Sequence, residues 1–207
     1  MEKGRQRMSE QTAERAKSEK GPRLSRQDWI EAALNALADG GVEAIRVEAL
    51  AKRLKVTKGG FYWHFRDRAD LYSALLEHWR QGRMEVIARQ TDLQDGGDAR
   101  ERLRQLLELY AGSRNVKGRA IELAIRDWAR REPMAAQIVA SVDDYRLERV
   151  GSLFRALGCS EQDAFARAYL FYAYVFGQSL LVPEAGDASH QQARAACARF
   201  LIDEVVG

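Results

Sequence analysis

The chain has 207 residues, of which 46% are hydrophobic and 30% charged, and its formal net charge is +3. This is the balance of an ordinary globular protein with room for one large or two modest cores. Residues 1–23 contain no apolar run that could form a signal-peptide core, and no later run is long enough to span a bilayer. Two distant cysteines form neither a metal-binding spacing nor a disulfide framework. We therefore expect a cytoplasmic protein with no membrane partner and no cofactor.

Residues 1–23 are predicted to be a mobile charged arm. They carry seven basic and four acidic side chains, few apolar ones, and a Gly21-Pro22 break near their end. A basic arm ahead of a DNA-binding unit can reach along the phosphate backbone or into the minor groove. A solvated tail without a role is the alternative interpretation.

The first predicted helix begins at Ser25. Ser25 and Asp28 have the spacing of a capping box, and Gly40 with Gly41 provides the stop signal. We expect Trp29 to lie in the core beside the buried stripe, which consists of Ile30, Ala33, Leu34 and Leu37.

Two short helices follow between residues 46 and 66. The first has an apolar stripe, and the second follows the N-cap candidate Thr57, with Phe61 and Phe65 one turn apart on the same face. This pattern predicts a helix-turn-helix, whose second helix can enter the DNA major groove. Residues 46–68 carry a net charge of +5, which suits a surface that meets phosphates. Alternatively, these cations only solvate the outer faces of two core helices. The stripe of the first helix is Val47, Leu50, Ala51 and Leu54.

The string VTKGGFYWHFRDRADL from residue 56, preceded by the helix VEALAKRL, resembles the DNA-binding signature of TetR-family transcriptional regulators. These are bacterial, all-helical homodimers. The signature covers about residues 24–71, and the rest resembles the family only in helix count, lengths and order. The resemblance implies an all-α fold of about nine helices, with a three-helix DNA-binding domain over residues 24–71. A larger helical domain over residues 72–207 would bind an effector and dimerise.

The resemblance also implies a set of DNA contacts. Tyr62 and His64 match positions that touch phosphate, and Lys58 can reach a phosphate or a guanine edge. Trp63 suits apolar contact with a thymine methyl or sugar, and Arg68 suits a bidentate phosphate contact. The complete set is Arg46, Thr57, Lys58, Gly59, Gly60, Tyr62, Trp63, His64 and Arg68.

Two residues depart from the family pattern. Lys55 stands at the turn where glycine is usual, and a left-handed backbone there would cost lysine about 1 kcal/mol or more. Gly60 stands where serine or threonine is frequent, which lowers helix propensity and could permit close approach to DNA.

The rest of the chain is predicted to be helical. A long helix capped by Asp67 is expected to run to about Thr91 and to join the two domains, with Leu71, Leu75, Trp79, Gly82 and Val86 on its inner side. Further helices are expected near residues 98–113, 117–131, 133–157, 160–182 and 187–206.

The run from Tyr169 to Val182 is apolar almost all round, which indicates a helix that is buried on more than one side. We expect one side to face a second subunit, as the family resemblance implies, and an ordinary core helix is the alternative. The predicted dimerisation residues are Tyr172, Phe176, Leu180, Cys197, Phe200 and Leu201.

The family resemblance also implies an effector cavity in the second domain. Aromatic residues at helical spacing are often plain core, and Glu122 with Arg126 could simply pair on the surface. The residues assigned to the cavity are Trp79, Tyr110, Ile125, Arg126, Trp128, Tyr145 and Phe154.

The sequence shows no motif of a catalytic site. Its three histidines are scattered, and metal, nucleophile and glycine-rich phosphate-loop patterns are absent, so we expect no enzyme. The favoured interpretation is a regulator, released from a palindromic double-stranded operator by a small-molecule effector of unknown identity. The alternative is a dimeric helical module that binds a ligand or protein and whose helix-turn-helix has degenerated.

Overall fold

The computed structural model describes residues 24–93, 97–112, 115–180 and 188–204. The predicted arm over residues 1–23 lies outside these ranges. In the described parts the protein contains nine α-helices and no strand, as expected from the sequence. The helices are α2 (Arg26–Gly40), α3 (Val47–Arg53), α4 (Lys58–Phe61), α5 (Arg68–Thr91), α6 (Ala99–Gly112), α7 (Val116–Ala129), α8 (Pro133–Ala156), α9 (Glu161–Leu180) and α10 (Ala188–Ala198).

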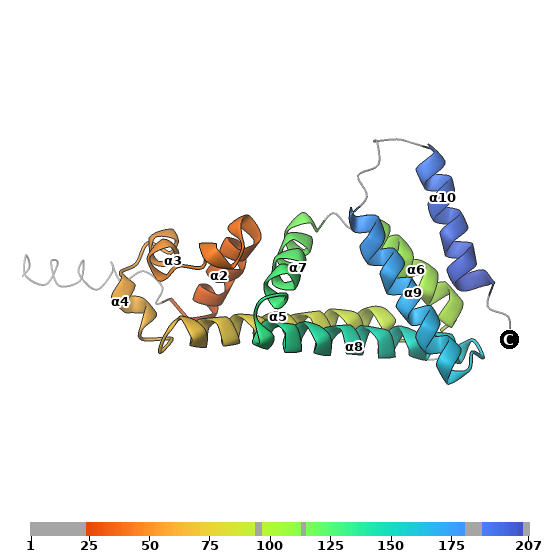
Figure 1. Ribbon diagram of the computed structural model, residues 1–207, viewed down its shortest axis with the longest axis horizontal. Helices are drawn as coiled ribbons and strands as arrows, with labels where there is room; N and C mark the ends of the chain where they lie inside the picture. The colour runs from red at the N-terminus through yellow and green to blue at the C-terminus, as the bar shows by residue number, and fades with distance from the viewer. Residues whose placement is uncertain (1–23, 94–96, 113–114, 181–187, 205–207) are drawn as a thin grey trace, which may run out of the picture.

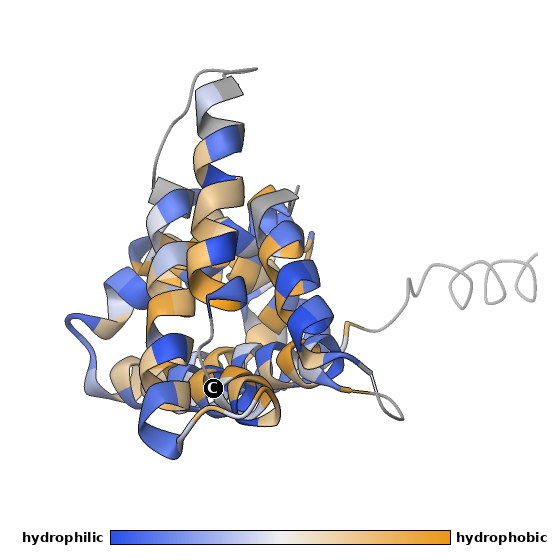
Figure 2. Ribbon diagram, turned by 90° about the vertical axis from the view of Figure 1, so that its right-hand side faces the viewer, coloured by the Kyte–Doolittle hydropathy of each residue, from blue (hydrophilic) through white to orange (hydrophobic). Residues whose placement is uncertain are grey.

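The two longest helices form the base of the molecule. Helices α5 and α8 run side by side along its long axis, and the other helices stand on them (Figure 1). Helices α2, α3 and α4 occupy one end, α7 stands near the middle, and α6, α9 and α10 occupy the other end. Figure 2, viewed along α5 and α8, shows the remaining helices rising on one side of this base. Because α5 begins shortly after α4, the base connects the two ends directly.

The helix starts follow the predicted capping signals. Ser25 and Asp28 form the complete capping box of α2, and the Asp67 side chain accepts a hydrogen bond from the Asp70 N–H at the start of α5. Pro133 is the first residue of α8. The Ser160 hydroxyl accepts a hydrogen bond from the Asp163 N–H, at 3.2 Å, as α9 begins.

Two hydrophobic cores lie along the base, and they do not divide at residue 71. The first core joins α2, α3 and α4 to α7 and to the first half of α8, so that Leu71 and Trp128 belong to one cluster. The second core is built from α6, α9, the last half of α8 and the π-helical turn Arg199–Asp203. The helix-turn-helix unit is therefore packed on part of the larger helical region.

Helix α5 departs from its predicted inner face towards its C-terminus. Leu71, Leu75 and Trp79 are buried as expected, but Gly82 is exposed and Val86 is only half-buried. Ile87 is the residue that enters the core instead, at 1% exposure. From Leu75 on, the predicted inner positions repeat every seven residues, whereas an α-helix has about 3.6 residues per turn. Along the helix the buried stripe therefore moves away from the predicted positions.

No helix among the described residues is both long and apolar enough to cross a bilayer.

Candidate nucleic-acid interface and ligand pocket

A tight turn joins α3 to α4. Lys55 has a φ of 57°, so the left-handed backbone considered at this position is present. The Val56 N–H donates a hydrogen bond to the Ala51 carbonyl at 3.0 Å, which closes the turn behind α3. The chain can then start α4 at a steep angle to α3, as a helix-turn-helix requires.

Aromatic packing fixes one side of α4 to the core. Phe61 is fully buried, contacts the Trp29 ring edge-on at 5.4 Å between centroids, and stacks on Phe65 at 5.3 Å. Trp29 is 1% exposed, which confirms its prediction as a core residue. Because these three rings hold the inner side of α4, the opposite side of this segment faces solvent.

The solvent side carries most of the predicted DNA contacts. Tyr62 is 57% exposed and Trp63 is 88% exposed, which is unusual for rings of this size. Thr57 is at the N-cap position, but its side chain makes no capping hydrogen bond and is exposed. Lys58 and Gly59 are also exposed. The structure thus gathers a hydroxyl, a cation, a phenol and an indole on one outward surface.

Lys58 is paired in the free protein. Its Nζ forms an ion pair with Oε1 of Glu48 on α3, at 2.5 Å, and both side chains are more than half exposed. The hydrogen bond between them raises the pKa of Lys58 and lowers that of Glu48. An exposed pair of this kind is weak and screened by salt, so a phosphate can take the lysine from Glu48.

The other four predicted DNA contacts differ in their surroundings. The Arg68 guanidinium lies over the Tyr72 ring at 5.0 Å, and its Nη2 lies 3.5 Å from the Val42 carbonyl. His64 is half-buried, whereas Arg46 is exposed at the N-cap of α3. A Cβ built on Gly60 would point to Trp29 at 3.9 Å, so this glycine faces α2 rather than open solvent.

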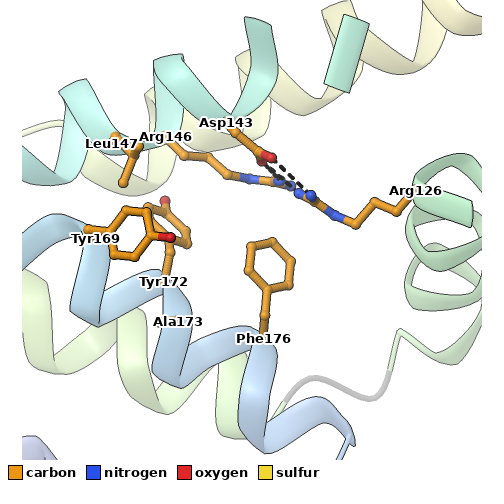
Figure 3. A pocket seen from close by; sticks show the side chains of 8 residues that line it. All are labelled: Arg126, Asp143, Arg146, Leu147, Tyr169, Tyr172, Ala173 and Phe176. Atoms are coloured by element: carbon orange, nitrogen blue, oxygen red, sulfur yellow. Dashed lines mark hydrogen bonds and ion pairs between the residues drawn. The ribbon is translucent and has the colours of Figure 1, made fainter. Parts of the chain in front are cut away.

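A pocket lies away from α4, between α7 near the middle of the molecule and helices α8 and α9 (Figure 3). Its volume is about 210 Å³. Arg126 enters from α7, charged side chains come from α8, and α9 supplies an aromatic wall. The lining residues are Arg126, Asp143, Arg146, Leu147, Tyr169, Tyr172, Ala173 and Phe176.

A network of ion pairs forms the polar wall of the pocket. Asp143 accepts hydrogen bonds from both terminal nitrogens of Arg126, at 2.9 and 2.6 Å, and one from Arg146 at 2.9 Å. Behind it, Glu122 accepts two hydrogen bonds from Arg146, both at 2.9 Å, and one from Arg126 Nε at 3.0 Å. Arg83 Nε of α5 lies 3.4 Å from Glu122 Oε2. The network therefore ties α5, α7 and α8 together.

The ionised form of this network is strongly favoured. Burial alone would raise the pKa of Glu122, but the Arg146 guanidinium outweighs burial and leaves that pKa below its ordinary value. Burial would lower the pKa of Arg146, and Glu122 reverses that effect, so the guanidinium is held protonated. Burial together with the neighbouring Tyr110 raises the pKa of Tyr172 well above its usual value, which keeps that phenol neutral.

The pocket differs from the one expected from sequence. Of the predicted lining residues, Arg126 is the one that reaches the cavity. Tyr110 lies one layer behind, 6.3 Å from the Tyr172 ring, and Tyr145 is half-buried against the first core. The expected surface pair of Glu122 and Arg126 exists, but Glu122 is buried. The remaining predicted residues are plain core: Trp79, Ile125, Trp128 and Phe154.

Sequence reasoning missed Asp143, Arg146 and the α9 side of the pocket. A signal for Arg146 was present, because it lies one turn from Val142 and one turn from Val150, in the middle of the buried stripe of α8. A charged residue inside an apolar stripe is buried at a cost and needs a partner. That partner is Glu122, which is far away in sequence.

Helix α9 presents a different stripe to solvent from the one predicted for dimerisation. Tyr172 is 5% exposed and Phe176 lies in the pocket, so both face their own subunit. The outward residues are Phe165, Tyr169 and Leu170, each more than half exposed, and Tyr169 also borders the pocket. The reason is that a helix apolar on all sides gives no periodic signal for its inner face. Among the other predicted residues, Phe200 is exposed, Cys197 and Leu201 are half-buried, and the side chain of Leu180 lies outside the described part.

The described parts of the chain contain no disulfide and no cluster of potential metal ligands. Cys159 and Cys197 are free thiols, and no three acidic, histidine or cysteine side chains gather there as metal ligands would.

Comparison with known proteins supports the first site most directly. Residues 30–75 match the family model of bacterial regulatory proteins of the tetR family. The chain is 38% identical over 53 residues to the transcriptional regulator AcrR of Shigella flexneri and 40% identical over 55 residues to the class C tetracycline repressor of Escherichia coli. These matches cover 26% and 27% of this chain, and each spans only 25% of the relative. With TtgR of Pseudomonas putida the identity is 34% over 83 residues, which is 40% of this chain and 39% of that protein.

Solved structures resemble the whole fold. A Saccharomonospora viridis protein crystallised in complex with choline superposes with a TM-score of 0.69 at 19% identity, covering 87% of this chain and 96% of its own. GusR of Salmonella enterica superposes with a TM-score of 0.67 at 17% identity, covering 86% and 95%. At such identities the likeness concerns the fold.

Proposed function

By its residues 30–75 the chain belongs to the TetR family of bacterial regulatory proteins, and from this premise we propose that it is a homodimeric, sequence-specific DNA-binding transcriptional regulator. The observation that carries the proposal is the exposed surface of α4 and of the turn that follows it, where Tyr62 and Trp63 are exposed within one helical turn or so of the exposed Lys58 along the chain. Solvent-exposed rings next to a cation, on a helix anchored by Phe61, are explained by contact with a nucleic acid.

In the proposed complex α4 lies in the major groove. Lys58 leaves Glu48 for a phosphate or a guanine edge, and the Tyr62 hydroxyl donates to a phosphate oxygen. Trp63 contacts a thymine methyl or a sugar with its apolar face. Arg46 and His64 support the phosphate contacts, whereas Arg68 must first leave the Tyr72 ring.

A second subunit is proposed to cover the outward stripe of α9. Phe165, Tyr169 and Leu170 form an exposed apolar patch on this helix, and Phe200 adds a further exposed ring near the C-terminus. Pairing two copies through this patch gives the two-fold symmetry that a palindromic operator requires.

The pocket between α7, α8 and α9 is proposed to bind a small-molecule effector that releases the operator. Such an effector lowers operator affinity by the ratio of its affinities for the two arrangements of the dimer. Helix α5 contacts the pocket network through Arg83 and begins next to α4, so its tilt can separate the recognition helices. The proposed protein acts by binding alone, as a repressor in the cytoplasm where its operator lies.

The proposal is tested by selection from a random duplex library with the purified protein. The selection is run at about physiological salt, where nonspecific phosphate binding is weakened. We expect enrichment of a two-fold symmetric motif. A folded dimer that enriches no motif would instead support a ligand- or protein-binding module with a degenerate helix-turn-helix.

Replacement of two α4 side chains tests the assigned surface. We expect Lys58→Ala combined with Tyr62→Ala to weaken binding of the selected operator by at least about tenfold, because each loses a contact to DNA. Lys58→Ala alone should reduce the slope of log affinity against log salt by about 0.9, as loss of one phosphate contact does.

Lys117→Ala is the matched control, since Lys117 is an exposed cation on α7, remote from α4. Equal losses of affinity in the control and the double variant, measured by fluorescence anisotropy, would refute the assignment of α4 as the recognition helix.

A further inference from the structure

The two carboxylates of the pocket network have different surroundings. Glu122 is 8% exposed at its side chain and is enclosed by three guanidinium groups, those of Arg83, Arg126 and Arg146. Asp143 is 34% exposed and lies at the pocket surface. Glu122 therefore neutralises the buried charge of Arg146, whereas Asp143 can turn into solvent at little desolvation cost.

Asp143 binds Arg126 as a carboxylate ligand would. Its two oxygens accept hydrogen bonds from the two terminal nitrogens of Arg126, at 2.6 and 2.9 Å. Figure 3 shows this pair close to the aromatic wall of the pocket. Such a fork-to-fork geometry is the preferred way for arginine to hold a free carboxylate. The site is thus preorganised for a carboxylate and is occupied by one from the chain itself.

The charge of the lining favours an anion. Arg126 and Arg146 contribute two positive charges against the single negative charge of Asp143. Behind the wall, Glu122 is shared by Arg83, Arg126 and Arg146, so the network as a whole carries three positive charges against two negative ones. If Asp143 swings out, the site carries two guanidinium groups with one buried carboxylate between them, which repels a cationic ligand and attracts an anionic one.

The apolar lining favours a flat ring. The Arg126 and Arg146 guanidiniums lie over the Phe176 ring at 4.4 and 5.4 Å, and Leu147 and Tyr172 form the adjoining wall. A volume of about 210 Å³ equals the space of roughly seven water molecules in the liquid. This space suits a single ring with a short acidic substituent.

We propose that the pocket binds a small aromatic carboxylic acid, whose carboxylate replaces Asp143 on Arg126 while its ring packs against Phe176. This inference rests on the proposed function of the pocket as an effector site and adds the chemical class of the effector.

Isothermal titration calorimetry of the full chain tests the class directly. The probes are benzoate, phenylacetate and 3-phenylpropanoate, each compared with its uncharged amide of nearly the same shape, and 2-phenylethylammonium as a cation. We expect at least one acid to bind tenfold or more tightly than its amide, and the cation not to bind. If every acid binds within threefold of its amide, the proposal fails.

Two variants separate displacement of Asp143 from a purely structural role. Asp143→Asn removes the competing carboxylate, so the acid that binds best should bind at least fivefold more tightly. Damage to the fold cannot produce such a gain. Asp144→Asn is the matched control, because it removes the same charge from the neighbouring exposed residue and should leave affinity unchanged. An unchanged or weakened affinity in Asp143→Asn overturns the displacement.

Substitutions of Arg126 should weaken binding of the acid, in contrast to Asp143→Asn. Arg126→Lys keeps the charge but loses the two-pronged geometry, and Arg126→Gln loses both, so acid affinity should fall in that order and by tenfold or more in the second. Arg130→Gln, at an exposed arginine one turn further along the chain, is the control. Unfolding curves of the wild type and of the three variants show whether the fold is retained. An Arg126→Gln protein that is folded and binds the acid with wild-type affinity contradicts the proposal.

Operator binding distinguishes the two proposals. If the chain binds a selected operator but none of the acids binds above its amide, the regulator stands and the ligand class is wrong. If the acids bind with the expected pattern but no operator is selected, the pocket stands and the DNA-binding function fails.

Discussion

At the scale of the single residue, the turn between α3 and α4 holds Lys55 in a backbone conformation that destabilises the folded protein. Its φ of 57° places a lysine Cβ in the left-handed region, where glycine has no steric penalty. Lys55→Gly should therefore raise the free energy of unfolding by about 1 kcal/mol, measured by urea denaturation. The residue is exposed, so no packing is lost with the side chain.

Lys52→Gly is the control for this prediction, and it should lower the free energy of unfolding instead of raising it. Lys52 is also exposed but lies in the last turn of α3, where glycine costs about 1 kcal/mol of helix propensity. Equal destabilisation by both substitutions would show that the left-handed backbone at Lys55 causes no strain. The sequence could indicate this position because a family pattern of glycine marks a backbone conformation, which lysine then has to adopt.

At the scale of the element, α8 buries the charged Arg146 inside its apolar stripe. The ion pair with the Glu122 carboxylate of α7 compensates the charge that is buried there. Glu122→Gln should lower the free energy of unfolding by about 3 kcal/mol at pH 7, because it removes the buried carboxylate partner of Arg146 and leaves only the more exposed Asp143 to pair with that charge. The folded-state pKa of Glu122 is lowered from its ordinary value of 4.5. Its stabilising contribution is therefore complete above that value and disappears as the pH falls through the folded-state pKa.

The difference in stability between the wild type and Glu122→Gln should accordingly shrink on acidification below about pH 4.5, where Glu122 of the unfolded chain takes up a proton, and should vanish at the lower pH at which folded Glu122 is protonated. Denaturant unfolding at several pH values measures this difference. Glu108→Gln is the control, since Glu108 is exposed on α6 and should change stability by less than about 0.5 kcal/mol. A difference that stays constant down to acid pH would exclude an ionised Glu122 as its source.

Sequence reasoning at this scale succeeded where the signal was local. Ser25 with Asp28 and the cap residue Asp67 each place a helix start by hydrogen bonds within one turn, and the structure confirms them. The pocket required contacts between α7, α8 and α9, which no local pattern contains. Arg126 was identified as polar, but its partner Asp143 is separated from it by a loop and about three turns of α8, so its position follows only from packing.

The same limit applies to α9, where the sequence gives the helix but not its orientation. Tyr172 and Tyr169 are three residues apart and chemically identical, yet one is 5% and the other 61% exposed. Periodicity distinguishes faces only when one of them is polar. The α3–α4 unit was predictable for the opposite reason, since Phe61 and Lys58 differ sharply in polarity and each face has its own composition.

At the scale of the whole molecule, the two ends must act together in a dimer. The recognition surface on α4 and the exposed apolar stripe on α9 lie at opposite ends of the base formed by α5 and α8 (Figure 1). A single α4 helix of four residues offers few contacts, so a monomer should bind an operator weakly. Tethering two copies makes the second contact effectively intramolecular and raises the affinity for two half-sites together.

Phe165→Glu combined with Leu170→Glu tests this arrangement. The four carboxylates that the two subunits would bury in this interface would lack partners, so the dimer should dissociate into folded monomers, measured by analytical ultracentrifugation. Operator affinity should then fall on the order of tenfold or more, because each monomer contacts one half-site. Helical circular dichroism should be unchanged, since both side chains are already exposed in the single chain.

Leu109→Glu, combined with Leu123→Glu, is the matched control, because these leucines are also exposed but lie on α6 and α7. This variant should remain dimeric and bind the operator normally. If it dissociates and the α9 variant does not, the subunits meet through α6 and α7, and the route from pocket to DNA would cross the dimer interface at the pocket itself. If neither dissociates, the outward stripe of α9 needs a partner other than a second copy of the chain.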